Sequence, residues 1–163
     1  MNIRLATYDD LDAIKDIFTV AKSKMTSDGN LEQWKDIDYP FCYTKDDISK
    51  KQCYVIEDDN GEVSATFVFI IGNDPTYSYI ENGKWLNSSK YGTIHRIASN
   101  GKIEHVFKMV LDYVSRYEVD IRVDTHKDNK RMIHLIETNG FNYCGIIYVK
   151  DGTPRKAYQK EKK

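Results

Sequence analysis

The sequence has few of the features that mark disulfide-rich, metal-binding or membrane-spanning chains. Its three cysteines, Cys42, Cys53 and Cys144, form no CxxC pair and no ligand-spaced cluster, so we expect reduced thiols and no bound metal. Its longest apolar run, residues 67–71, is far shorter than the ~20 residues that span a bilayer. The basic start of a signal peptide, followed by an apolar segment, is also missing. We therefore expect a cytoplasmic protein with no membrane attachment.

Neither sign of charge is in excess. The chain has 24 Lys and Arg residues against 25 Asp and Glu residues, a net charge of −1. A nucleic-acid-binding domain usually carries a basic excess or stripe, so we expect no nucleic-acid partner. A chain of 163 residues can bury about 70% of its unfolded surface as one domain. No linker or repeat divides it, so we expect a single domain over residues 1–163.

The hydrophobic pattern alternates between helical and strand spacing. The expected helices begin at Asp9, Thr44, Gly101 to Ile103 and Asn129, with a broken helical region through Leu31, Trp34 and Ile37. The expected strands are 3–6, 52–57, 62–71, 91–99, 120–124, 141–149 and 155–159. A helix between two strands favours a parallel pair, whereas the hairpins are antiparallel. The sequence therefore predicts an α/β (α+β) fold with a mixed, mostly antiparallel sheet of about seven strands flanked by helices.

One segment carries a pattern found in a known family. Asn129 opens a helix, Met132 and Leu135 follow three and six residues later, and Gly140-Phe141 closes it. With the strand 91–99 before it, this pattern resembles the GNAT superfamily of N-acetyltransferases. Further details resemble a bacterial GNAT group with poorly defined substrates: Gln33-Trp34, Tyr39-Pro40, His95-Arg96, Thr125-His126 and the run 144–148.

The resemblance implies the GNAT acyl-CoA N-acyltransferase fold and an activity. Members transfer an acetyl group from acetyl-CoA, the cosubstrate, to a primary amine by direct attack in a ternary complex. The acceptor would be a small molecule or a peptide, and a homodimer is common in the family. The alternative is a catalytically weak or inactive GNAT-like protein that binds CoA as a sensor.

The resemblance also implies where the cofactor lies. The fourth strand would bulge and splay so that its free backbone groups pair with the pantetheine amides; otherwise it is an ordinary paired strand. The following turn would hold the pyrophosphate, and the helix-opening Asn would either touch the pantetheine arm or only cap its helix. These candidate cofactor residues are Ile97, Ala98, Ser99, Asn100, Gly101, Lys102 and Asn129.

The pyrophosphate loop departs from the family pattern. The usual R/Q-x-x-G-x-G/A has two glycines, whereas Ser99 to Val106 contains only Gly101. The free N–H groups and partial positive charge of a helix N-terminus bind phosphate without a motif. Glu104 in the first turn, however, would repel a pyrophosphate if it pointed inward.

Two residues are candidates for proton transfer. His95, on the strand face of Thr93 and Ile97, is either a core residue or the general base that deprotonates the amine. The family's Tyr, seven residues after the Asn, is Ile136 here. Tyr148 is then either the acid that protonates the departing thiolate or a tyrosine on a sheet face.

On the acceptor side, the resemblance points to Trp34 and Tyr39. They either bind the amine or anchor an irregular loop.

Overall fold

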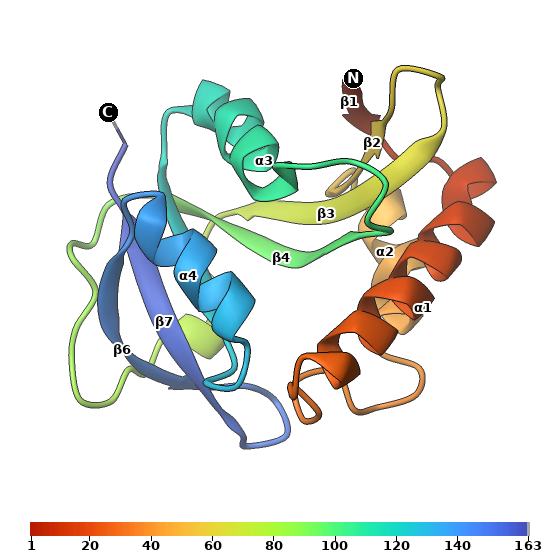
Figure 1. The fold of residues 1–163 in the computed structure, drawn as a ribbon. Coiled ribbons are helices and arrows are strands. Elements are labelled where there is room, and N and C mark those ends of the chain that lie inside the picture. Colours follow the sequence, from red (N-terminus) through yellow and green to blue (C-terminus); the bar gives the residue numbers. More distant parts are fainter. Residues whose placement is uncertain (163) are drawn as a thin grey trace.

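A computed structural model describes residues 1–162 and contains one seven-stranded sheet in the order β1-β2-β3-β4-β5-β7-β6 (Figure 1). The strands are β1 (Asn2–Leu5), β2 (Cys53–Glu57), β3 (Val63–Ile71), β4 (Tyr91–Ser99), β5 (Asp120–Thr125), β6 (Asn142–Tyr148) and β7 (Pro154–Lys160). The helices are α1 (Leu11–Ser27), α2 (Thr44–Ser49), α3 (Val106–Val114) and α4 (Lys130–Thr138), with 3-10 turns η1 (Tyr8–Asp10), η2 (Phe41–Tyr43), η3 (Pro75–Tyr77) and η4 (Ser115–Tyr117). Among the seven strands of residues 1–162, only β4 and β5 pair in parallel. The mixed, mostly antiparallel seven-stranded sheet is therefore confirmed.

Helices cover both faces of the sheet. One apolar cluster joins α3 and α4 to the strands through buried residues such as Phe67, Val110 and Ile136. A second cluster joins α1 and α2 to the opposite face through residues such as Ile14 and Val55. Each helix buries one apolar stripe against its face of the sheet. The ends of the helices are therefore available to line a site beside the sheet.

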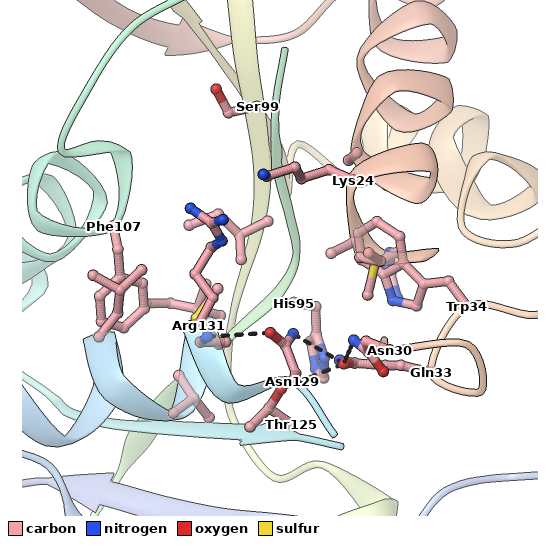
Figure 2. A pocket seen from close by; sticks show the side chains of 18 of the residues that line it. Lys24, Asn30, Gln33, Trp34, His95, Ser99, Phe107, Thr125, Asn129 and Arg131 are labelled. Carbon is pink, nitrogen blue, oxygen red and sulfur yellow. Dashed lines mark hydrogen bonds between the residues drawn. The ribbon is translucent and has the colours of Figure 1, made fainter. Parts of the chain in front are cut away.

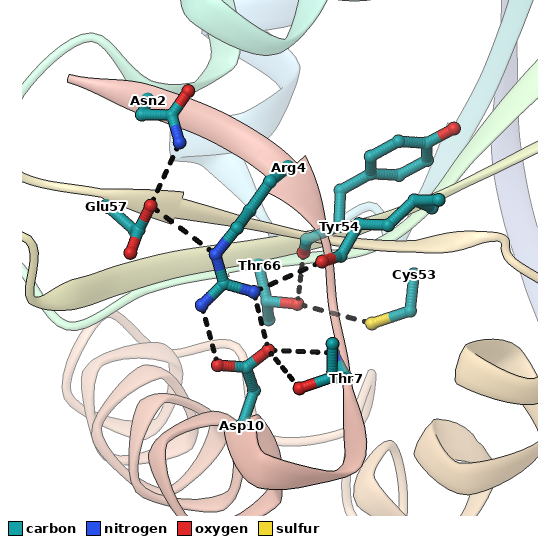
Figure 3. Close-up of polar contacts among 9 residues, drawn as sticks. Asn2, Arg4, Thr7, Asp10, Cys53, Tyr54, Glu57 and Thr66 are labelled. Carbon is teal, nitrogen blue, oxygen red and sulfur yellow. Dashed lines mark hydrogen bonds and ion pairs between the residues drawn. The ribbon is translucent and has the colours of Figure 1, made fainter.

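A polar network fixes α1 against the sheet edge (Figure 3). Arg4 of β1 donates two hydrogen bonds to the carboxylate of Asp10, at 2.8 and 2.9 Å, and lies 3.4 Å from Glu57 of β2. The backbone N–H of Thr7 donates to the same carboxylate at 2.8 Å. Asp10 thus ties the start of the first helical segment to β1, and Arg4 extends the link to β2.

Two expectations about helices are wrong. Residues 31–37 form turns and bends instead of a broken helix. Leu31 and Ile37 are 58% and 90% exposed. These two side chains therefore pack on no apolar face that would stabilise a helix. Helix α3 begins at Val106, not near Ile103. Gly101 and His105 adopt left-handed backbone angles (φ 83° and 59°), which interrupt helical geometry before Val106.

Within residues 1–162, no helix combines the length and apolar character needed to cross a bilayer.

Candidate active site

The central feature of the site is the separation of β4 from β5. Their parallel pairing ends at Thr93 opposite Arg122, so the second half of β4 has no partner on that side. On its other side β4 bulges: Val68 pairs with His95 and Thr66 with Ala98, so one residue of β3 faces two of β4. The extra residue, Arg96, has φ 50°. The bulge and the splay implied by the GNAT resemblance are therefore both present.

A cleft of about 1890 Å³ opens at this separation. Its walls come from the C-terminal half of α1, the segment 30–43, β4, the loop 99–105, β5 and α4. Figure 2 shows Lys24 of α1 and Arg131 of α4 extending into the cleft from opposite walls. Both cations approach Asp28: Lys24 Nζ lies 3.6 Å from its carboxylate and an Arg131 guanidinium nitrogen 3.2 Å. This carboxylate therefore links the two walls.

The loop between β4 and α3 presents free backbone donors. Its first three N–H groups are already used: Asn100 donates to the Ser64 carbonyl, Gly101 to the Ser99 hydroxyl and Lys102 to the Asn100 side-chain oxygen. Across the part of the chain that the structure describes, the N–H groups of the six residues 103–108 have no acceptor. A run of free donors at a helix N-terminus is a general anion-binding arrangement.

The side chains of the predicted cofactor residues have different surroundings. Ile97, Ser99, Asn100, Gly101 and Asn129 line the cleft. The Ala98 side chain is buried on the opposite face of the sheet, in the cluster with α1. Only the backbone of Ala98 can therefore contact a cofactor in the cleft. Lys102 pairs with Glu62 at 3.2 Å and is not among the residues that line the cleft, so its side chain gives no support to a phosphate contact there.

Asn129 caps α4 and also joins it to the acceptor-side segment. Its side-chain oxygen accepts from the Met132 N–H at 3.1 Å, and its Nδ2 donates to Gln33 Oε1 at 3.0 Å (Figure 2). The same Gln33 oxygen accepts from Asn30 at 3.0 Å and from Thr125 at 3.4 Å. Gln33 therefore holds the segment 30–40 against both β5 and α4. The capping interpretation of Asn129 is confirmed.

The bulge turns His95 and Arg96 toward the same side of the sheet. Arg96 makes a bidentate pair with the buried Asp47 of α2 at 2.8–3.1 Å, while Ile97 packs with the α3 and α4 cluster. The expectation that His95 shares a face with Ile97 is thus wrong, because the extra residue shifts the alternation by one. Burial raises the pKa of Asp47, although the Arg96 charge opposes that shift.

His95 lines the cleft and has an acidic partner. Its Nε2 lies 3.0 Å from Asp74 Oδ2, and the two side chains are 21% and 18% exposed. Burial favours a higher pKa for the Asp74 carboxyl, but hydrogen bonds with His95 and Thr76 outweigh it and lower the pKa. The sequence does not predict the contact between Asp74 and His95. The available signal was the long segment 72–90, since loops of that length are usually functional.

The predicted acceptor residues belong to an aromatic row. Trp34 packs edge-on against Phe18 of α1, with ring centres 5.8 Å apart, and against Tyr39 at 6.2 Å. Tyr39 in turn contacts Tyr43 at 5.7 Å. Trp34, Tyr39 and Tyr43 all line the cleft. The anchoring interpretation therefore holds for Trp34, and the binding interpretation remains a prediction for both Trp34 and Tyr39.

Tyr148 lies elsewhere. It is at the end of the edge strand β6, where its hydroxyl donates to Glu81 and its ring stacks near Tyr79, and it is not among the residues that line the cleft. The sequence-based role of Tyr148 as catalytic acid therefore has no support from its position. Among residues 1–162, no three His, Cys, Asp or Glu side chains gather in a metal-binding group.

Comparisons with known proteins agree with this geometry. No protein-family model and no curated protein matches the sequence. Solved structures do match. A GNAT-family acetyltransferase from Streptococcus agalactiae is 31% identical, with a TM-score of 0.89 over 99% of this chain and 95% of that one.

Two further structures share the fold at lower identity. A GNAT-family acetyltransferase from Listeria monocytogenes is 20% identical, with a TM-score of 0.71 over 98% of this chain and 94% of that one. A chain of the NatB acetyltransferase complex bound to CoA is 11% identical, with a TM-score of 0.65 over 98% of each chain. With its splayed central strands and the similarity to the streptococcal protein along nearly its whole length, the chain belongs to the GNAT acetyltransferase family.

Proposed function

We propose that the protein transfers an acetyl group from acetyl-CoA to a primary amine by direct attack in a ternary complex. The observation that carries this proposal is the continuity between two features. The unpaired edge of β4 leads directly into the loop whose N–H groups at 103–108 have no acceptor within residues 1–162. An extended amide-bearing arm and a pyrophosphate are the two parts of CoA that such an edge and such a loop can bind.

The residues present fit this cosubstrate. The backbone of Ile97, Ala98 and Ser99 would pair with the pantetheine amides, and the N–H groups at 103–108 would bind the pyrophosphate. Lys24 and Arg131 line the cleft and, although both approach Asp28, would add positive charge beside the phosphates. The CoA-bound NatB structure, which shares the fold, supports this assignment. The cosubstrate supplies an activated acetyl thioester, and the protein supplies orientation and dipoles.

His95 is the proposed general base. An amine is mostly protonated near neutral pH and must lose a proton before it can attack a thioester. His95 accepts that proton, the amine lone pair forms the new C–N bond, and the C–S electron pair leaves with the thiolate sulfur. The second amine proton neutralises the thiolate directly or through water. No dedicated acid is required, because a thiol with a pKa of ~8.5 leaves readily as its anion.

The acceptor side is lined by Trp34, Tyr39 and Tyr43 together with Asn30. Asn30 is 4% exposed and its side-chain oxygen has no donor among the described residues. Asn30 also lines the cleft, and we propose that this oxygen accepts from an N–H group of the bound acceptor. Aromatic rings beside a hydrogen-bond acceptor suit the amine of a small molecule or of a peptide.

A second candidate function is a CoA sensor with little or no transfer activity. It is favoured by Ile136, a fully buried side chain at the family's Tyr position, and by the acidic Glu104 in the phosphate-binding loop. The two candidates share a binding site and differ in turnover.

Two measurements test the proposal. Calorimetric titration with acetyl-CoA is expected to show one site per chain, and an assay of CoA thiol release over a panel of amines is expected to find an acceptor. Binding without amine-dependent release across a broad panel would favour the sensor. Absence of binding by the folded protein would contradict both candidates.

A further inference from the structure

A carboxylate in the loop after β3 holds the imidazole of His95. Asp74 and His95 are 21 positions apart in the sequence, and their contact, 3.0 Å between Oδ2 and Nε2, forms where the loop returns to β4. His95 lines the cleft, and its Nδ1 has no hydrogen-bond partner among residues 1–162. One ring nitrogen is therefore occupied and the other is free.

The orientation of Asp74 is fixed by two bonds besides the one to His95. Its Oδ1 accepts from the Thr76 N–H at 2.9 Å, as the cap of the 3-10 turn η3. Its backbone N–H donates to the hydroxyl of Tyr91 at 2.8 Å, and Tyr91 is 5% exposed. Rotation of the carboxylate would break the cap, so Oδ2 stays directed at the imidazole.

The charge state of the pair follows from its surroundings. The hydrogen bonds from His95 and Thr76 keep the pKa of Asp74 low despite its burial, so it is an ionised group that only accepts hydrogen bonds. The neutral imidazole must then carry its proton on Nε2 and keep the lone pair on Nδ1. Two further charged groups near His95 are Asp47 of α2 and Arg96 of β4. These two are paired with each other, whereas Asp74 is in direct contact with the imidazole, at 3.0 Å, and can serve as the counter-charge for an imidazolium.

We propose that Asp74 is a positioning residue that fixes His95 in the Nε2–H tautomer, so that Nδ1 is the nitrogen that takes the proton of the acceptor amine. This inference rests on the proposed acetyl transfer for its kinetic consequence. The tautomer itself is a property of the free protein. The proton moves from the amine nitrogen to Nδ1, and the resulting imidazolium keeps its Nε2–H bond to Asp74.

The Asp74→Asn variant tests the tautomer. Because Oδ1 remains the acceptor for Thr76, the amide NH2 of the new Asn faces Nε2 and donates to it. The imidazole proton must then move to Nδ1, which blocks the lone pair. Nitrogen-15 NMR of the free protein, with the His95 signal assigned by its loss in His95→Gln, is expected to show Nε2–H in the wild type and Nδ1–H in Asp74→Asn.

The kinetic arm uses the same variant. The rate of acetyl transfer is expected to fall by about 10²-fold or more, with the affinity for acetyl-CoA unchanged. Asp58→Asn is the matched control: Asp58 also caps a turn through Oδ1, accepting from the N–H groups of Asn60 and Glu62, but it does not line the cleft. This control is expected to keep both the tautomer and the rate.

Three results would overturn the inference. One is an Nδ1–H tautomer in the wild type, and this measurement does not depend on the folding of any variant. Another is an unchanged Nε2–H tautomer in Asp74→Asn. The third is a changed tautomer with an unchanged rate. If no amine is acetylated by the wild type, the proposed function fails, while the tautomer measurement still decides the role of Asp74.

Discussion

A single extra residue in β4 decides which side chains face the cleft. Without the bulge at Arg96, strict alternation would place His95 and Arg96 on opposite faces of the sheet. With it, Arg96 reaches Asp47 while His95 reaches Asp74. Arg96 adopts its left-handed backbone angle, and we attribute the stability of this unfavourable conformation to the bidentate ion pair.

The His95→Gln substitution tests the proposed base. Gln can keep a hydrogen bond to Asp74 but cannot take a proton at neutral pH. We expect the rate of acetyl transfer to fall by about 10²-fold or more, with acetyl-CoA affinity unchanged. Single-turnover kinetics and calorimetry measure the two quantities. Tyr148→Phe is the control and is expected to leave the rate nearly unchanged, because Tyr148 lies outside the cleft. Equal rates for His95→Gln and wild type would place the base elsewhere.

The Glu104→Lys substitution tests whether the loop after β4 binds the pyrophosphate, as proposed. Its side chain is 90% exposed and lines the cleft beside the free N–H groups. A negative charge there repels a pyrophosphate, so Glu104→Lys is expected to tighten acetyl-CoA binding by roughly threefold or more at low salt, with a smaller gain at high salt. Calorimetry at two salt concentrations measures the change. The charge-matched control is Glu161→Lys near the C-terminus, and an equal gain from both variants would contradict this location.

At the scale of elements, the link between β1, β2 and η1 is electrostatic. The hydrogen bonds from Arg4 lower the pKa of the Asp10 carboxyl, with further lowering by the Thr7 N–H. Since the folded pKa is below the unfolded value of ~3.9, this carboxylate stabilises the fold fully above that pH. The contribution is lost as the pH falls from about 4 through the folded pKa.

The Asp10→Asn variant checks this link. It removes a charge that accepts two Arg4 hydrogen bonds, so the free energy of unfolding at neutral pH is expected to fall by about 2 kcal/mol. The loss of stability between neutral and acidic pH is expected to be smaller than in the wild type, as measured by urea unfolding across that range. Acid curves with the same slope for both proteins would show that Asp10 contributes nothing through its charge.

For the molecule as a whole, the sequence predicts the features that depend on neighbouring residues, namely most strands, helices and helix caps. The strands and α4 follow from periodicity and from signals such as Asn129 and Gly140, which act on neighbouring residues. The start of α3 could not be predicted, because Ile103 continues the apolar spacing while the backbone leaves helical geometry at His105. The contacts of Asp74 and Gln33 with the site join segments 21 to 96 positions apart. Such contacts depend on how the sheet is assembled, which no local pattern specifies.

We propose that acetyl-CoA binds in the opening between β4 and β5 and at the loop that follows β4. The most direct test is a titration of the nitrogen-15-labelled protein with acetyl-CoA, followed by amide NMR. We expect saturable shifts concentrated in residues 97–99 and 103–108, with little change at β1 or β6. Saturable binding whose shifts fall away from these residues, or no binding by the folded protein, would contradict it.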